Sequence, residues 1–90
     1  MNLNLWRKKL DEIDEKIIKL VASRIKVIPE IARFKKENDL ARFDAEREKK
    51  IKEKISFLAG KEGVSPELAQ KIIELLIAES HRIEREIIGK

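Results

Sequence analysis

The sequence contains no cysteine, and its 90 residues include only three glycines and two prolines. Without cysteine, the chain has neither disulfide bonds nor thiolate ligands for a metal. Few glycines and prolines leave little material for turns, so the composition favours long helices over sheet. No apolar run reaches the length of a membrane span and no signal peptide opens the sequence. We therefore expect a cytoplasmic location without membrane contact.

The composition is 42% hydrophobic and 42% charged, a mixture that suits amphipathic helices. A chain of this length predicts a single domain, 1–90, whose own core is small, so we expect it to associate. The net charge is +4, but acidic and basic residues are interleaved, as in residues 7–12 and 46–50. Mixed signs at helical spacing are typical of a solvated face, so we predict no nucleic-acid binding. Abundant lysine and glutamate favour a thermophilic source.

An apolar helical seam begins near the N-terminus and is broken at one position. At alternating spacings of three and four, the seam comprises Leu3, Trp6, Leu10, Ile13, Ile17, Leu20, Arg24, Val27, Ile31 and Phe34. The guanidinium of Arg24 stays ionised, so burying it requires an anionic partner. Lys35 follows eleven residues later, within about 20° of the same face and roughly 16 Å along the axis. These two cations leave room between them for a small anion.

The sequence predicts a long first helix from about Leu3 to Glu37, with Asn38 and Asp39 at its end. Pro29 falls inside this helix, where proline costs roughly 3 kcal/mol. The segment therefore either kinks at Pro29 or breaks into two helices. Because the apolar seam continues across Pro29, we favour the kink.

Two shorter helices are predicted after the first. Asp44 suits the N-cap or first turn of a helix from about residue 44 to residue 59, and Gly60 and Gly63 then flank a loop. Ser65, followed by a proline, is the expected N-cap of a third helix that extends to about Ile88. The expected buried stripe of this third helix comprises Leu68, Ala69, Ile72, Ile73, Leu76, Ile77, Ile83, Ile87 and Ile88.

Two polar residues interrupt the stripe of the third helix. Ser80 and Glu84 lie one turn apart on that face. Together with Arg24 and Lys35, they predict a polar pocket inside an all-helical core. The alternative is a buried salt bridge between Arg24 and Glu84 with no pocket, because buried charges are usually paired.

These residues resemble the all-helical class of chorismate mutases, and the resemblance extends without gaps from residue 6 to residue 88. The matching residues and segments are Arg7, 13–18, Arg24, Lys35, 44–48, 77–80 and Glu84. Each segment alone is common, whereas all of them in this order and at the family spacing are a specific signal.

The resemblance implies an all-α fold in which three-helix subunits, each with a long first helix, form an intertwined homodimer. It implies a single chorismate mutase domain that converts chorismate to prephenate, toward phenylalanine and tyrosine, without a metal or cofactor. The reaction rearranges one bound molecule that carries two carboxylates. A suitable site clamps both carboxylates in the reactive geometry and places donors at the ether oxygen, where negative charge grows.

The family match assigns roles to three cations. Arg24 clamps a carboxylate within its own subunit, and Lys35 donates to the ether oxygen. Arg7 is the second clamp, but it lies seventeen residues before Arg24, roughly 25 Å along the axis. One site cannot use both residues from the same chain. Arg7 is therefore expected to enter the pocket of the partner subunit.

Four further residues complete the expected substrate-binding site. By resemblance, Asp44, Arg47 and Glu48 line the ring side of the substrate, and Glu48 accepts a hydrogen bond from its hydroxyl. Ser80 is expected to make a polar contact near a carboxylate.

Glu84 departs from the many family members that carry glutamine at this position. Glutamine donates to the ether oxygen at any ordinary pH, whereas a carboxyl group donates only when protonated. We therefore expect activity to decline as pH rises, with a flatter profile for Glu84→Gln. His81, the only histidine, points about 100° away from Ser80 and is expected at the surface or boundary. Trp6 and Phe34 are expected to be core residues.

Two other functions fit the same sequence. An isochorismate pyruvate-lyase on this frame also clamps a dicarboxylate, although residues 44–48 favour the mutase. The second alternative is a non-enzymatic helical dimerisation module, in which the seam forms a coiled coil and Arg24 selects the partner.

Overall fold

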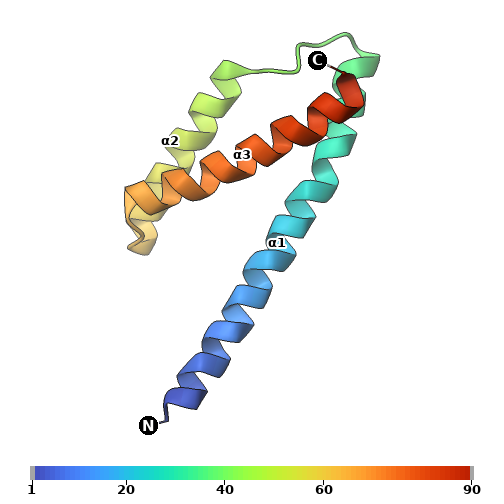
Figure 1. Ribbon diagram of the computed structural model, residues 1–90. Coiled ribbons are helices and arrows are strands. Elements are labelled where there is room, and N and C mark those ends of the chain that lie inside the picture. Colours follow the sequence, from blue (N-terminus) through green and yellow to red (C-terminus); the bar gives the residue numbers. More distant parts are fainter. Residues whose placement is uncertain (1, 90) are drawn as a thin grey trace.

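The computed structural model describes residues 2–89, and every regular element in that range is an α-helix (Figure 1). Helix α1 spans Leu3–Glu37, α2 spans Ala45–Glu62 and α3 spans Pro66–Ile88. The predicted all-α fold with a long first helix is confirmed. Within the described range, no helix is long and apolar enough to cross a membrane.

Helix α3 is the central element, because it packs against both α1 and α2. Figure 1 shows α2 and α3 running in roughly opposite directions and diverging from the turn that joins them, while only the C-terminal half of α1 crosses α3. The N-terminal half of α1 extends away from both. The radius of gyration is 16.5 Å, against about 12 Å for a compact domain of this length. One copy of the chain is therefore strongly elongated.

The helix ends follow from local hydrogen bonding. The side chain of Asp44 accepts from the backbone N–H of Arg47 at 3.0 Å, and Ser65 caps α3 in the same way through Leu68. Both predicted N-caps are confirmed. Asn38 is the C-cap of α1, at the predicted end of that helix.

The end of α2 differs from the prediction. Helix α2 continues to Glu62, so Gly60 lies inside the helix, and the prediction that it borders a loop is wrong. The helix ends instead at Gly63, whose φ of 73° is the left-handed conformation that favours glycine.

Pro29 does not break α1. The neighbouring side chains of Ile28 and Ala32 are buried against the rest of the subunit, and this packing offsets the lost backbone hydrogen bond.

The apolar core is small and lies beside the predicted seam. Its buried side chains are Ile28, Ala32, Ala59, Ala69, Ile73 and Ile77. Every described residue from 2 to 20 is exposed, including the seam residues of that segment. Trp6 and Phe34 are 49% and 61% exposed, so their prediction as core residues is wrong for the single chain. In α3, Leu68 and Ile72 of the predicted stripe are exposed as well.

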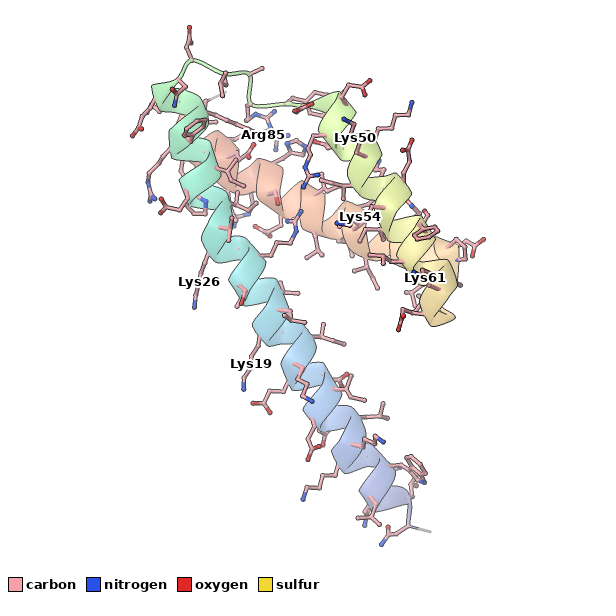
Figure 2. The ribbon with its side chains drawn as sticks, turned by 180° about the vertical axis from the view of Figure 1, so that it is seen from behind. Lys19, Lys26, Lys50, Lys54, Lys61 and Arg85 are labelled. Atoms are coloured by element: carbon pink, nitrogen blue, oxygen red, sulfur yellow. The ribbon has the colours of Figure 1, made fainter. Side chains whose placement is uncertain are left out.

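The interleaved charges form local pairs on the helix surfaces. Lys19 pairs with Glu15 at 2.9 Å, one turn apart on the exposed half of α1, where Lys19 points away from the other helices (Figure 2). On α3, Arg82 pairs with Glu79 and Glu86. The hydrogen bond from Arg82 to Glu79 raises the pKa of the guanidinium above its ordinary value. Such exposed pairs contribute little stability.

Candidate functional site

A cavity of about 230 Å³ lies where the C-terminal half of α1, the start of α2 and the C-terminal half of α3 meet. Seven of the eight predicted site residues line it: Arg24, Lys35, Asp44, Arg47, Glu48, Ser80 and Glu84. Residues from three separate helices therefore converge on one space. Arg7 lies in the exposed half of α1 and does not reach this cavity within its own chain.

Arg24 occupies a partly buried position at one end of the cavity. Its Nη1 atom donates to the carbonyl oxygen of Leu76 at 3.1 Å and to Ser80 Oγ at 2.5 Å. Both acceptors are neutral, and Glu84 pairs with a different cation. The alternative of an Arg24–Glu84 salt bridge without a pocket is therefore wrong. The positive charge of Arg24 is held in place and faces a cavity, which is the arrangement expected of an anion-binding group.

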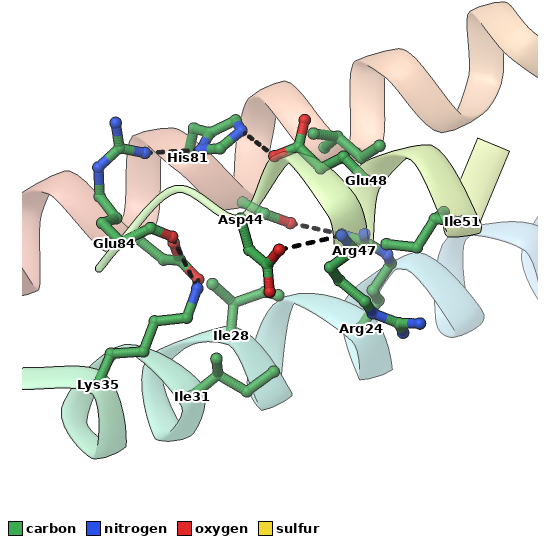
Figure 3. A pocket seen from close by; sticks show the side chains of 13 residues that line it. Arg24, Ile28, Ile31, Lys35, Asp44, Arg47, Glu48, Ile51, His81 and Glu84 are labelled. Carbon is green, nitrogen blue, oxygen red and sulfur yellow. Dashed lines mark hydrogen bonds and ion pairs between the residues drawn. The ribbon is translucent and has the colours of Figure 1, made fainter. Parts of the chain in front are cut away.

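Lys35 and Glu84 form an ion pair at the other end of the cavity. Lys35 Nζ lies 3.3 Å from Glu84 Oε1 and donates to the carbonyl oxygen of Arg42 at 2.8 Å. Glu84 is the one buried polar residue of the described chain, with 5% of its surface exposed. Figure 3 shows Lys35 and Glu84 facing each other, with Arg24 and Arg47 beyond Ile28 at the opposite end. The cavity thus has a cation at each end.

The start of α2 supplies the wall opposite α1. Asp44 caps the helix and lines the cavity, and Arg47 and Glu48 follow in the first turn. Glu48 Oε2 lies 2.7 Å from Nε2 of His81 on α3. The capping bond that begins the helix therefore also places its charged first turn at the cavity.

Two lining residues were missed by the sequence analysis. His81 lies at the boundary, as expected, with 17% of its side chain exposed, but its place in the wall of the cavity was not predicted. Arg42, in the segment 38–44 that connects α1 to α2, also lines it and contacts His81 Nδ1 at 2.6 Å. Helical periodicity could not find either residue, because Arg42 lies outside the helices and His81 lies off the apolar stripe. The connecting segment passes over that side of α3 and extends the cavity to it.

The cavity combines a positive balance with apolar walls. Four basic and three acidic side chains line it, together with isoleucines 28, 31, 51 and 77. Ser80 is not an activated nucleophile, because its hydroxyl donates to the carbonyl oxygen of Leu76 at 2.9 Å and His81 is turned to other partners. In the described residues, no three histidine, aspartate or glutamate side chains are grouped to hold a metal. The arrangement suits electrostatic binding of a small anion better than nucleophilic chemistry.

Comparisons with known proteins point to one family. The family model described as chorismate mutase type II matches residues 6–85. The chain is 34% identical over 82 residues to the chorismate mutase of Methanocaldococcus jannaschii, covering 91% of this chain and 83% of that protein.

Two longer proteins also match. The bifunctional chorismate mutase/prephenate dehydratase of Buchnera aphidicola subsp. Acyrthosiphon pisum is 36% identical over 89 residues, covering 99% of this chain. Its counterpart in Buchnera aphidicola subsp. Schizaphis graminum is 31% identical over 85 residues, covering 94% of this chain. The chain spans 23% and 22% of the length of these two bifunctional relatives.

Proposed function

The chain belongs to the chorismate mutase type II family, and we propose that it converts chorismate to prephenate. The enzyme is then an isomerase, and residues 1–90 act as one mutase domain. The observation that carries the proposal is the position of Arg24. Its half-buried guanidinium is fixed by neutral acceptors, and it faces a cavity whose other end holds Lys35.

The chemistry of the rearrangement matches this distribution of charge. Chorismate carries two carboxylates, and its enolpyruvyl arm must fold over the ring before the bonds can exchange. Cations fixed at both ends of a cavity bind the two carboxylates in the folded shape, which lowers the entropic part of the barrier. Losing one preorganised donor at the developing negative charge typically costs about 3–4 kcal/mol of barrier.

The lining residues take the following roles in this proposal. Arg24 holds one carboxylate, with Ser80 beside it. Lys35 and the protonated form of Glu84 donate to the ether oxygen as its bond to carbon lengthens. The separation of 3.3 Å between Lys35 Nζ and Glu84 Oε1 supports the position of both groups, because the two side chains point into the same end of the cavity. The ionised carboxylate of this pair only accepts, so donation by Glu84 to the ether oxygen requires that it first take up a proton.

The first turn of α2 binds the ring side of the substrate. Glu48 accepts a hydrogen bond from the ring hydroxyl, while Asp44 and Arg47 line the same wall. A carboxylate suits this task because it is a strong acceptor for a hydroxyl donor. These side chains lie on the first turn of a capped helix, so their backbone is fixed before substrate binds.

The active form is a homodimer in which Arg7 enters the cavity of the second copy. The chain exposes 7433 Å², about 2,000 Å² more than a compact protein of 10.5 kDa. A second copy that covers this excess forms an interface in the size range of obligate dimers. We further propose a cytoplasmic location and a thermophilic source.

Product analysis tests the proposed activity directly. The purified chain is incubated with chorismate and, separately, with isochorismate, and the products are identified by chromatography. We expect prephenate from chorismate. Salicylate and pyruvate from isochorismate, without prephenate from chorismate, would instead assign the chain to the lyase. No turnover of either compound, with no binding of a small dianion, would favour a dimerisation module.

A further inference from the structure

His81 links two charged groups at the wall of the cavity. Its Nδ1 atom lies 2.6 Å from Arg42 Nη1, and its Nε2 atom lies 2.7 Å from Glu48 Oε2. Arginine has only donors, so Nδ1 must accept and carries no proton. The ring proton is therefore on Nε2, and it is donated to the carboxylate. The contact with Glu48 is therefore a hydrogen bond from a neutral imidazole, and Figure 3 marks this contact beside the cavity.

The imidazole is enclosed as well as hydrogen-bonded. The side chains of His81 and Glu48 are 17% and 21% exposed. The ring of Phe43 lies against the imidazole, with the two ring centroids 5.6 Å apart and the planes inclined by 35°. A rotation of His81 would break both hydrogen bonds and this ring contact together. The position of the ring is therefore set by groups from two other parts of the chain.

We propose that His81 is a positioning residue that orients Glu48 to accept the hydroxyl of the bound substrate. This role rests on the proposed function. Because His81 occupies Oε2 of Glu48, the carboxylate presents its other oxygen for a further donor. The long glutamate side chain is ordered before binding, so the substrate does not have to order it.

The same contacts give the segment 38–44 an indirect role in the site. Arg42 holds His81 through Nδ1, and the carbonyl oxygen of Arg42 accepts from Lys35 at 2.8 Å. One residue of the connection thus restrains side chains on both walls of the cavity. His81 itself does not act as an acid or base, because the rearrangement transfers no proton.

The tautomer of His81 can be measured without any substrate. The chain contains one histidine, so imidazole ¹⁵N NMR gives a single pair of ring signals that need no assignment among residues. We expect a protonated Nε2 and an unprotonated Nδ1 at neutral pH. The Nδ1-protonated form, or a freely exchanging mixture, would overturn the proposed role.

Kinetics with two compounds then test what the orientation of Glu48 achieves. The compounds are chorismate and the analogue in which hydrogen replaces the ring hydroxyl. For His81→Leu, we expect kcat/KM for chorismate to fall roughly 10-fold, since misplacing a positioned group by 1 Å can cost about 100-fold. The inhibition constant of the deoxy analogue should stay within about twofold of the wild-type value.

Two further variants separate positioning from folding. In His81→Gln, the side-chain amide can still donate to Glu48, so most of the lost kcat/KM should return. Arg82→Gln, at the exposed neighbouring position, is the matched control. It should leave kcat/KM for chorismate and the inhibition constant of the deoxy analogue unchanged.

Each contrary result has a distinct meaning. In His81→Leu, a loss of affinity for the deoxy analogue as large as the loss of kcat/KM for chorismate would indicate a structural role and overturn the proposal. A kcat/KM of His81→Gln as low as that of His81→Leu would also overturn it. If the wild-type chain does not form prephenate, the proposed function is wrong. The proposed role of His81 is then wrong as well, whatever tautomer the NMR spectrum reports.

Discussion

At the scale of single residues, the site depends on charged groups held at positions where apolar side chains would pack. Arg24 lies in an apolar seam and Glu84 in an apolar stripe, and both line the same cavity. A buried charge that merely stabilised the fold would be expected to bind an opposite charge directly. Arg24 instead binds neutral oxygens. Its position is therefore better explained by binding an anion that is not part of the chain.

The proton on the carboxyl group of Glu84 should make the activity depend on pH. Its carboxyl group can donate to the ether oxygen only in the protonated form, whose fraction falls as pH rises. We expect kcat/KM of the wild-type chain to decline with increasing pH and that of Glu84→Gln to stay nearly constant. Steady-state rates between pH 5 and about pH 9 measure both profiles.

Glu86→Gln provides the control for this prediction, because Glu86 is exposed on the same helix. It should retain the wild-type pH profile. An unchanged profile in Glu84→Gln would show that Glu84 does not donate to the reacting oxygen.

Site residues that break an apolar pattern can be predicted from the sequence, whereas site residues outside such a pattern cannot. Arg24, Ser80 and Glu84 could be predicted because a polar group at an apolar helical position is conspicuous. Arg42 and His81 could not, since their place in the cavity depends on the path of segment 38–44. That path is set by tertiary contacts, such as Lys35 with the carbonyl oxygen of Arg42, which have no local sequence signature.

At the scale of helices, the two glycines near the end of α2 are in different environments. Gly60 lies within the helix and has open space beside it, with no atom beyond its own stretch of backbone within 4 Å of an added Cβ, whereas Gly63 has a φ of 73°. We expect Gly60→Ala to raise the free energy of unfolding by about 0.5–1 kcal/mol. Gly63→Ala should lower it by roughly 1–2 kcal/mol. Urea unfolding at one fixed chain concentration measures both.

The two substitutions add the same methyl group three residues apart, so each is the control for the other. Effects of the same sign would contradict the helix end at Gly63. The sequence predicted this end too early because glycine was taken as the boundary at its first occurrence. Helix interiors tolerate a single glycine, and only the left-handed conformation at Gly63 ends the helix.

The course of α1 through Pro29 illustrates the other limit of local reasoning. The sequence allowed a kink or a break, because a proline costs roughly 3 kcal/mol in a helix, and the continuous seam favoured the kink. Buried contacts at Ile28 and Ala32 hold the helix on α3 on both sides of the proline. The helix is unbroken, so the break is excluded, as the continuous apolar seam indicated, and the kink itself stays a prediction.

At the scale of the whole molecule, one copy of the chain leaves much of its first helix without a packing partner. All described residues from 2 to 20 are exposed, although the segment carries Trp6 and several large aliphatic side chains (Figure 2). An isolated helix of this length is only marginally stable in water. Association was predicted from the sequence. The spacing of apolar residues did not, however, distinguish the face of α1 that packs on α3 within the chain from the seam.

A charge placed in the seam should therefore prevent association. We expect Ile13→Asp to sediment as a monomer, to lose helical circular dichroism and to lose mutase activity. Lys19→Asp, which changes a position of the same helix outside the seam, should remain associated because the pair it removes contributes little. Ile13→Asp that still sediments with the wild-type mass would place the interface elsewhere.

Mixing two variants tests most directly whether Arg24 of one chain and Arg7 of another clamp the same substrate. Arg7→Ala and Arg24→Ala are each expected to lose at least about 100-fold in kcat/KM while keeping their helical content. When equal amounts are unfolded together and refolded, half of the dimers contain one chain of each kind, and one of their two sites has both arginines. The mixture should regain about a quarter of the wild-type rate. A mixture no more active than its components, or an Arg24→Ala variant with the wild-type rate, would contradict the account.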